Sequence, residues 1–169
     1  ISLKDASFEK GLREILTNAI GSYLLEKARQ YKFKEKPIVL FVDEAHQFLK
    51  KTISDDSFED LELDAFDKIA KECRKHGLFL CISTQTPRDI PVGTLSQMGT
   101  FIVHRLINEA DRAVIEKACS EGNKNSLAYL PSLQSGEALL ISIEMPMPII
   151  IKIKEPTIKP TSLTPKLFI

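Results

Sequence analysis

The apolar residues of the chain recur with two different periods. Between Phe8 and Tyr31 they return every three or four positions, which predicts an amphipathic helix. The runs "IVLFV" (38–42), "LFLCIS" (78–83) and "TFIVHRL" (100–106) are instead short and almost continuously apolar. These runs predict strands, and the first two are typical of strands that are buried on both faces of a parallel sheet.

Helical patterns separate these strands. We expect a polar loop over residues 50–58 and then a helix from about Asp60 to His76, because cationic residues gather at its end and Gly77 follows. Another helix is expected after Asn108, whose side chain can cap the first turn. This order of strands and helices predicts an α/β fold, with a mostly parallel sheet and helices on both faces.

The last third of the chain has a different pattern. The apolar runs at residues 137–143 and 149–153 bracket "EMPMP", which predicts a β-hairpin at the edge of the sheet, where prolines are tolerated. Residues 156–169 contain further prolines and predict an extended arm. We therefore expect one α/β unit over residues 1–155 and a carboxy-terminal arm over residues 156–169.

Composition narrows the setting of the protein. The chain has 169 residues, enough for one core, and 23 basic residues balance 23 acidic ones, so no whole-chain field attracts nucleic acid or membrane. An odd number of cysteines at uneven spacing argues against a disulfide framework and predicts a cytoplasmic protein. No membrane partner is expected, because no apolar run reaches about 18 residues. The opening "ISLKDAS" lacks an initiator Met, so we expect a piece of a longer protein.

Two carboxylates stand where the first predicted strand ends. In parallel sheets, ligands bind outside the carboxyl ends of the strands, which is where Asp43 and Glu44 fall. There Asp43 can hold Mg²⁺ and Glu44 can deprotonate a water that attacks a phosphate. For an isolated pair, the commoner role is to begin a turn and cap the following helix. His46, just beyond the pair, is interpreted as a structural hydrogen-bonding residue.

Cys73, His76 and Cys81 have spacing that resembles a metal site. Cys73 is expected on the apolar face of its helix and Cys81 inside a strand. Core packing is therefore the favoured interpretation of these residues over zinc binding.

Three motifs in the same order resemble a known family. The segments "VLFVDEAHQFL", "AKECRKHGLFLCISTQTPRDIPVGTLSQMGTFIVHRLINEAD" and "LPSLQSGEALL" are similar to the second half of HerA-type ATPases, in the HerA and FtsK branch of the RecA-like hexameric motors. The resemblance covers residues 1 to about 155. It implies the second half of a RecA-like P-loop NTPase core. "DEAH" is also motif II of another helicase superfamily, but the Ser-Ala-Thr motif of those enzymes and room for their second domain are both missing.

The resemblance also implies roles for single residues. Asp43 and Glu44 correspond to the Walker B pair, as Mg²⁺ ligand and catalytic base, and Gln85 in "STQTP" corresponds to the polar sensor of the γ-phosphate or the attacking water. Arg74 in "CRKHG" corresponds to an arginine offered to the nucleotide of the neighbouring subunit. From the residues alone, Gln85 can equally cap its loop, and a cation such as Arg74 suits the end of a helix in any case.

Further cations are alternatives for the arginine role. Lys75 can share the role of Arg74, and Arg105, after a strand, is the second candidate for the arginine finger. The family often has an arginine after the sensor glutamine, where this chain has Thr86, so Arg88 is the possible substitute.

One motif of the family does not occur in these residues. No segment reads GxxxxGK[ST], and "EGNKNS" (121–126) lacks the glycine spacing and the Gly-Lys pair. In the family this Walker A segment lies upstream. The chain is therefore expected to carry the hydrolytic half of a site whose phosphate-binding half lies elsewhere.

The resemblance implies an ATP-driven and Mg²⁺-dependent motor. Six subunits would form a ring that moves double-stranded DNA, in partnership with a NurA-type nuclease or with an antiphage effector such as a sirtuin-like NADase. The alternative is a ring-assembly scaffold that does not hydrolyse ATP. An intact upstream Walker A motif would favour the motor, and a degenerate one would favour the scaffold.

Overall fold

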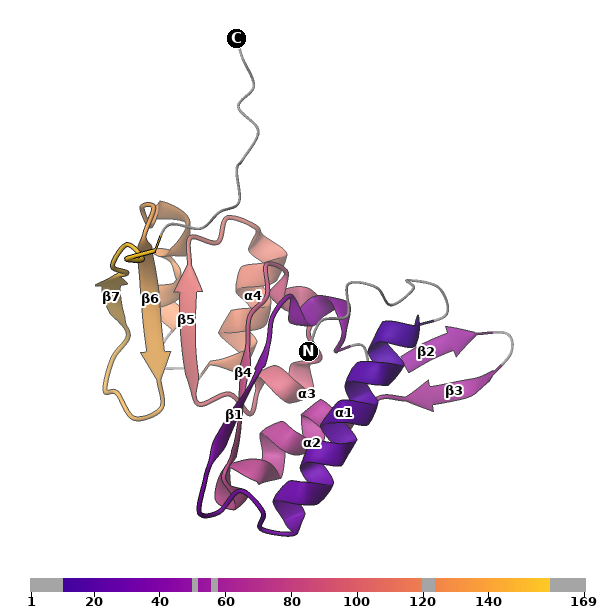
Figure 1. Cartoon of the computed structure of the whole chain (residues 1–169). Coiled ribbons are helices and arrows are strands. Elements are labelled where there is room, and N and C mark those ends of the chain that lie inside the picture. Colours follow the sequence, from indigo (N-terminus) through magenta and orange to yellow (C-terminus); the bar gives the residue numbers. More distant parts are fainter. Residues whose placement is uncertain (1–10, 50–51, 56–57, 120–123, 159–169) are drawn as a thin grey trace.

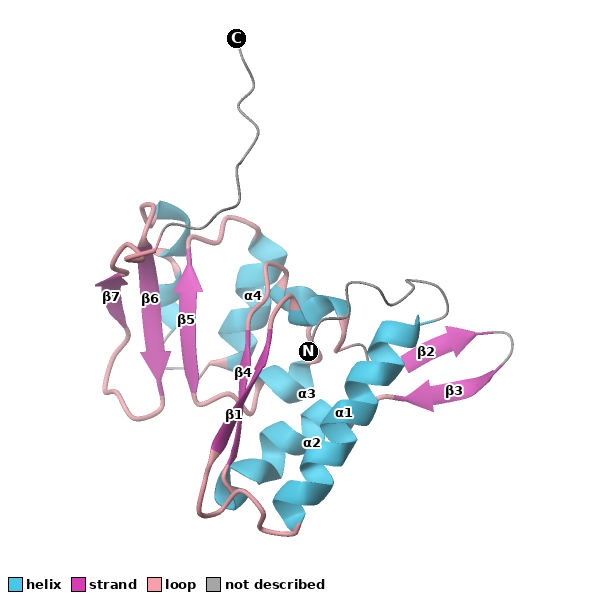
Figure 2. Ribbon diagram, viewed as in Figure 1, coloured by secondary structure: helices cyan, strands magenta, loops and turns pink. Residues whose placement is uncertain are grey.

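The computed structural model describes residues 11–49, 52–55, 58–119 and 124–158. Figure 1 shows the chain, and Figure 2 shows its helices and strands. The helices are α1 (Leu12–Arg29), α2 (Ala65–Glu72), α3 (Val92–Leu95), α4 (Glu109–Ala118) and α5 (Lys124–Leu127). The strands are β1 (Ile38–Val42), β2 (Thr52–Asp55), β3 (Phe58–Glu62), β4 (Leu78–Ile82), β5 (Thr100–His104), β6 (Glu137–Ser142) and β7 (Ile149–Lys152). Four short 3-10 segments join them, including η2 (Ala45–Gln47) and η3 (Cys73–His76).

The central strands form two groups that are not hydrogen-bonded to each other. β1 and β4 pair in parallel, with Val42 opposite Ile82, and β5, β6 and β7 form an antiparallel sheet. The β6–β7 pair is the hairpin that the sequence predicts. In Figure 1, β5 stands beside β4 with a gap between the ribbons. The α/β fold with a parallel strand pair is confirmed, but the described strands do not form one continuous sheet.

Burial alternates along the strands instead of covering both faces. In β1 and β4 the side chains of Leu40, Val42 and Leu80 pack toward the helices, whereas Phe41 is 73% exposed and Phe79 is 40% exposed. β5 shows the same alternation. The expectation of strands buried on both faces is therefore wrong for these residues, because the described helices pack against only one set of side chains.

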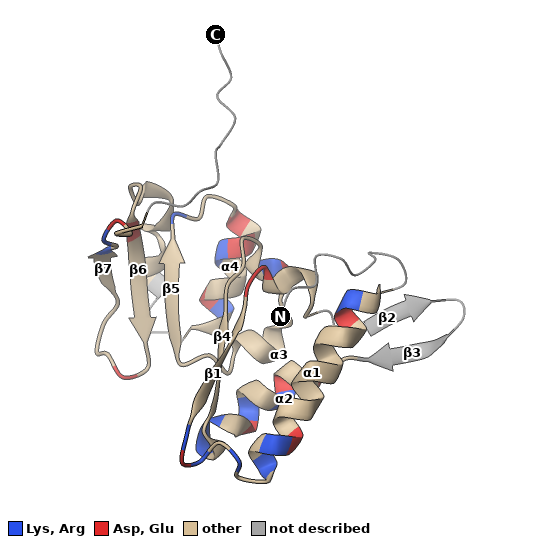
Figure 3. Cartoon of the chain, in the orientation of Figure 1, with Lys and Arg blue, Asp and Glu red and all other residues tan. Residues whose placement is uncertain are grey.

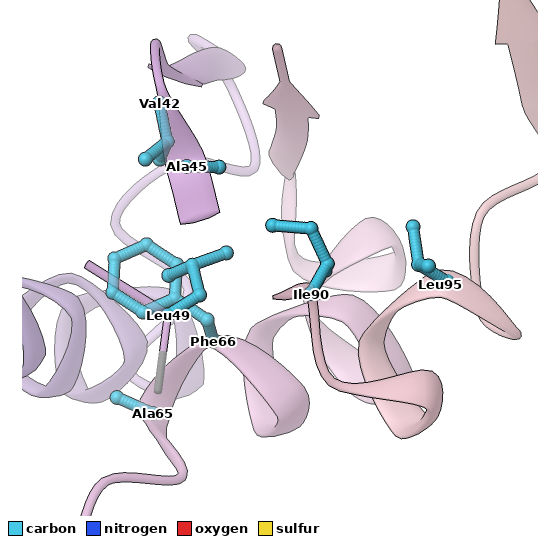
Figure 4. Packing of buried hydrophobic residues seen from close by; sticks show 7 residues of the cluster. All are labelled: Val42, Ala45, Leu49, Ala65, Phe66, Ile90 and Leu95. Atoms are coloured by element: carbon cyan, nitrogen blue, oxygen red, sulfur yellow. The ribbon is translucent and has the colours of Figure 1, made fainter. Parts of the chain in front are cut away.

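The main core lies between the strands and the helices. Figure 4 shows one cluster in which residues of β1, α2 and the segment of η2 and its following residues meet residues before and within α3: Val42, Ala45, Leu49, Ala65, Phe66, Ile90 and Leu95. A second cluster joins α1, α2 and the start of β4. The third packs α4 and α5 on the β5–β6 sheet. The end of β1, which Asp43 follows directly, is therefore held in place by packed apolar side chains.

The structure corrects two expected boundaries. The segment predicted as a loop leading into a helix at Asp60 contains a β2–β3 hairpin, with Thr52 opposite Glu62, and α2 begins only at Ala65. The first helix spans Leu12–Arg29, and Phe8 lies outside the described residues. Asn108 caps α4 as predicted, because its side chain accepts a hydrogen bond from the backbone N–H of Asp111. Most of the arm predicted over residues 156–169 lies outside the described residues, and the division at residue 155 stays a prediction.

Candidate functional site

Asp43 and Glu44 occupy a tight turn directly after β1. The backbone N–H of Ser83 donates to the carbonyl of Val42, and the N–H of Ala45 donates to the carbonyl of Ser83, so the turn is fastened to the end of β4. Glu44 has φ 47° and ψ 45°, in the left-handed region that non-glycine residues rarely occupy. Such backbone strain is maintained by surrounding contacts and clusters at functional sites.

Gln85 meets Glu44 across the turn. Its Nε2 donates a hydrogen bond of 2.7 Å to Oε1 of Glu44, although the two residues follow different strands. The sequence placed both residues at the carboxyl edge of the sheet, and the structure brings their side chains into contact. One carboxylate oxygen of Glu44 is therefore held by a neutral donor.

The second oxygen of Glu44 has a different environment. Oε2 is buried and accepts no hydrogen bond among the described residues. Nδ1 of His46 lies 3.4 Å away, but the ring nitrogen makes its hydrogen bond with Thr84 Oγ1 at 3.1 Å. A buried carboxylate oxygen without a donor is costly, and it keeps its full capacity to accept a proton.

Asp43 provides exposed oxygen atoms next to this pair. Its side chain is exposed at the carboxyl edge, where Oδ1 accepts the backbone N–H of Glu44 at 3.0 Å. An exposed aspartate beside a glutamate with an unpaired oxygen fits the oxygen ligands that Mg²⁺ prefers. Asp43 is the residue that would hold the ion, and Glu44 stands beside it.

Arg74 lies at the opposite edge of the sheet. It precedes β4 by four residues and forms a 3.3 Å ion pair with Glu144, which follows β6. Ser142, the last residue of β6, pairs with Thr100, the first residue of β5, so the amino ends of β4 and β5 lie at the edge marked by this ion pair. Arg74 is therefore separated from Glu44 and Gln85 by the length of β4, and both ion-pair partners are largely exposed.

The other candidate cations are distributed over both edges. Lys75 is exposed beside Arg74 in η3. Arg105 follows β5, at the same edge as Gln85, and is exposed. The side chain of Arg88 points to α4, because its Nε lies 3.9 Å from the buried carboxylate of Asp111, whose Oδ1 also accepts the Arg88 backbone N–H. This arrangement gives Arg88 a structural partner and leaves Arg105 as the cation beside the candidate site.

A cleft of about 990 Å³ separates β4 from β5. The residues of both strands line it, Arg74 and Glu144 stand at one end, and Gln85 and Arg105 stand at the other. Figure 3 shows that the strand ribbons facing the gap carry no Lys, Arg, Asp or Glu. The cleft is therefore apolar along its length and polar at its ends.

The structure places the three cysteines in different environments. No group of three or more His, Cys, Asp or Glu residues in the described ranges could hold a metal ion. Cys73 is buried, and burial raises the pKa of its thiol. Burial also raises the pKa of the Cys119 thiol, to about 11. Cys81 is exposed, so the expected core packing is correct for Cys73 and wrong for Cys81. The one-sided cover of β4 is the physical reason.

Sequence reasoning missed two residues of this region. Thr84 contacts the His46 ring, and buried Asp111 fixes the loop after β4 through Arg88. The polar run "STQTP" directly after a strand was the available signal for Thr84.

No helix in the described part of the chain is long and apolar enough to cross a membrane.

Comparisons with known proteins agree on one family. The family described as Helicase HerA-like C-terminal matches residues 22–165. The chain is 32% identical over 144 residues to the probable helicase MJECL08 of Methanocaldococcus jannaschii, covering 85% of this chain and 26% of that protein. It is 31% identical over 153 residues to the probable DNA double-strand break repair helicase HerA of the same organism, covering 90% of this chain and 29% of that protein. The chain thus spans less than a third of the length of these relatives.

A solved structure shares the fold. The genome packaging NTPase B204 from Sulfolobus turreted icosahedral virus 2, in complex with ATP-gammaS, superposes with a TM-score of 0.63 at 20% identity, covering 81% of this chain and 62% of that chain. At this identity the likeness concerns the fold alone. Together with the match over residues 22–165, these findings establish that the chain belongs to the HerA-like helicase family and corresponds to its carboxy-terminal part.

Proposed function

We propose that the chain is the hydrolytic half of an ATP-driven, double-stranded DNA translocase of the HerA type. The observation that carries this proposal is the contact between Glu44 and Gln85 at the carboxyl edge of a parallel strand pair. It joins an acid with a free buried oxygen to a neutral amide, as expected for residues that orient water against a phosphate.

Three residues divide the chemistry. Asp43 would hold Mg²⁺, which would neutralise charge on the phosphates. Glu44 accepts a proton at Oε2 from a water molecule whose oxygen bonds to the γ-phosphorus of ATP, while the bond to the β-phosphate oxygen breaks and ADP leaves. Gln85 fixes Oε1 and orients the water or the γ-phosphate without adding charge.

Arg74 acts on the nucleotide of an adjacent subunit. Its position at the amino edge keeps it away from the Glu44 of its own chain, and a 69% exposed side chain is accessible to a neighbour. Lys75, exposed beside it, can share this role. Arg105 is the alternative cation, because it flanks the cleft at the same edge as Gln85. The contact of Arg88 with Asp111 argues against an active-site role for Arg88.

The phosphate-binding half comes from polypeptide outside residues 1–169. β4 and β5 each leave one edge unpaired toward the cleft, and exposed backbone groups at a strand edge favour pairing with another strand. The open apolar face of β1 and β4, with Phe41 and Phe79, likewise needs a cover. A strand in the cleft would leave the sheet between Gln85 and Arg105, where its following turn could hold phosphates beside Glu44.

The whole protein would work as a hexameric ring in the cytoplasm, with duplex DNA in its pore. Its partner would be a NurA-type nuclease or an antiphage effector such as a sirtuin-like NADase. These assignments rest on the family.

The test uses the full-length protein that contains this chain. ATP hydrolysis with Mg²⁺ should occur and should rise when linear duplex DNA is added, whereas residues 1–169 alone should not bind ATP at micromolar concentrations in calorimetry, because they lack a phosphate cradle. Ring formation without any ATP hydrolysis would contradict the motor and favour the scaffold. Tight binding of ATP by the isolated chain would contradict the assignment of the phosphate-binding half to another segment.

A further inference from the structure

We propose that His46 is a positioning residue for Glu44, acting together with Thr84 to keep one carboxylate oxygen free to accept a proton. This inference rests on the proposed ATPase function. It deepens that function by assigning work to two residues that do not themselves touch the nucleotide.

The backbone holds His46 firmly against Glu44. His46 lies in η2, where the N–H groups of Gln47 and Phe48 donate to the carbonyls of Glu44 and Ala45. Ala45 is fully buried in the core cluster. The backbone is therefore held in place both before and after His46. The imidazole is itself only 23% exposed and has little freedom to leave Glu44.

Thr84 holds the ring nitrogen of His46 in a hydrogen bond. Its Oγ1 already accepts a hydrogen bond from the backbone N–H of Thr86 at 3.2 Å, which leaves the hydroxyl proton available as a donor. Nδ1 of His46 lies 3.1 Å from this hydroxyl. Whichever of the two atoms donates, this contact engages Nδ1 with Thr84.

The consequence reaches Glu44 Oε2. Nδ1 makes its hydrogen bond with Thr84, and Oε2 of Glu44 has none among the described residues although the two atoms are 3.4 Å apart. The ring thus lies beside Oε2 without a hydrogen bond to it. Gln85 meanwhile fixes Oε1, so the carboxylate is held in one orientation with one oxygen left for the attacking water.

A purely structural histidine would behave differently from a positioning one. Replacing a structural residue lowers stability and, where the site is distorted, the affinity for ATP. Replacing a positioning residue lowers kcat with little change in KM, because only the orientation of the proton acceptor is lost.

The experiment measures steady-state ATP hydrolysis by four variants of the full-length protein. His46→Leu and Thr84→Val should each lower kcat by at least about tenfold, with KM for ATP changed by less than about threefold, since small misplacements at a reacting group have large effects on rate. His46→Asn and Thr84→Ser retain a polar atom near the positions of Nδ1 and Oγ1 and should recover most of the loss. Thr17→Val is the matched control, because Thr17 Oγ1 donates to the carbonyl of Arg13 in its own helix.

Coupling between the two positions supplies an independent readout. If both residues act through one contact, the double variant His46→Leu/Thr84→Val should be no less active than the less active of the two single variants. Multiplicative losses, a failure of His46→Asn to recover activity despite an unchanged melting temperature, or kcat values within threefold of the parent would each overturn the proposal.

Failure of the proposed function has a different appearance. A full-length parent without ATP hydrolysis would overturn that function and this inference together. A parent whose turnover is removed by Glu44→Gln but unaffected by His46→Leu would overturn this inference alone.

Discussion

Glu44 is one of two non-glycine residues in the described ranges that have a positive φ. Its left-handed conformation turns the side chain toward Gln85 and His46, whose atoms lie 2.7 and 3.4 Å from its two oxygens. The motif order predicted that Glu44 and Gln85 lie at one edge of the sheet. The contacts of His46 and Thr84 were not predictable, because they depend on the direction that a positive φ gives to the turn.

Gln85 should matter through its hydrogen bond to Glu44. In the full-length protein, Gln85→Ala should lower ATP turnover by at least about tenfold while ATP binding is retained, because the amide orients a catalytic group and carries no charge for the phosphates. Gln97→Ala is the control, since this exposed glutamine is near the opposite edge of the cleft. Equal turnover of the two variants would contradict the role of Gln85 as a sensor.

At the scale of the elements, local patterns predicted most of the order and missed the pairing. β1, β4, β5 and the β6–β7 hairpin lie where apolar runs placed them. The β2–β3 hairpin was missed because its residues are mostly polar, and hairpin pairing depends on partners across the turn. The open face was missed because continuous apolar runs do not reveal which elements cover them.

Gly77 joins η3 to β4 and tests how these elements are connected. It has φ 81°, and a Cβ built there would lie 2.1 Å from the carbonyl oxygen of Phe33. Gly77→Ala should therefore lower the free energy of unfolding by at least about 2 kcal/mol, from left-handed strain and overlap with backbone. Gly99→Ala is the control, because its nearest contact would be 3.4 Å from a side chain of Ile143. Urea unfolding of both variants measures the difference, and equal midpoints would contradict the close approach.

At the scale of the whole molecule, the main open feature of the described residues is the cleft between β4 and β5. The absence of a GxxxxGK[ST] motif predicted that half of the site is supplied elsewhere. The cleft between the edges of β4 and β5, which are unpaired among the described strands, was not predicted and came from the structure alone. Strand order in a sheet depends on contacts between distant segments, which the pattern of one short chain does not encode.

Cys81 reports directly on the cleft. It is exposed and lines the cleft in this chain, so a thiol reagent at pH 8 should modify it faster than buried Cys73 or half-buried Cys119. The raised pKa of Cys119, about 11, keeps its thiol protonated at pH 8, and its labelling should accelerate as the pH rises toward that value.

The labelling rate of Cys81 in this chain is then compared with its rate in the full-length protein. There Cys81 should become protected at the same pH, because an added strand would cover it. Peptide mass spectrometry gives the rates for each cysteine. The same rapid labelling of Cys81 in both proteins would contradict a filled cleft.

Mixed rings test whether Arg74 serves a neighbouring subunit. Full-length Arg74→Ala and Glu44→Gln proteins should each be nearly inactive, whereas rings assembled from both should recover activity where an intact Glu44 meets an intact Arg74 across an interface. If Arg74 acted on the nucleotide of its own subunit, mixing could not restore activity, since no subunit in the mixture has both Arg74 and Glu44 intact. Mixed rings without recovery would exclude Arg74 and direct attention to Arg105.

The central claim is that Glu44 is the proton acceptor in an ATP-hydrolysing protein, and one measurement addresses it most directly. In the full-length protein, Glu44→Gln keeps an oxygen that can accept from Gln85 Nε2 but removes the charge at Oε2. ATP binding and ring assembly should be unchanged, and steady-state turnover should fall by at least about a hundredfold, as expected for loss of a general base. Glu155→Gln, at an exposed glutamate beyond β7, should leave turnover unchanged. Turnover by the Glu44→Gln protein within about tenfold of the parent would contradict the account.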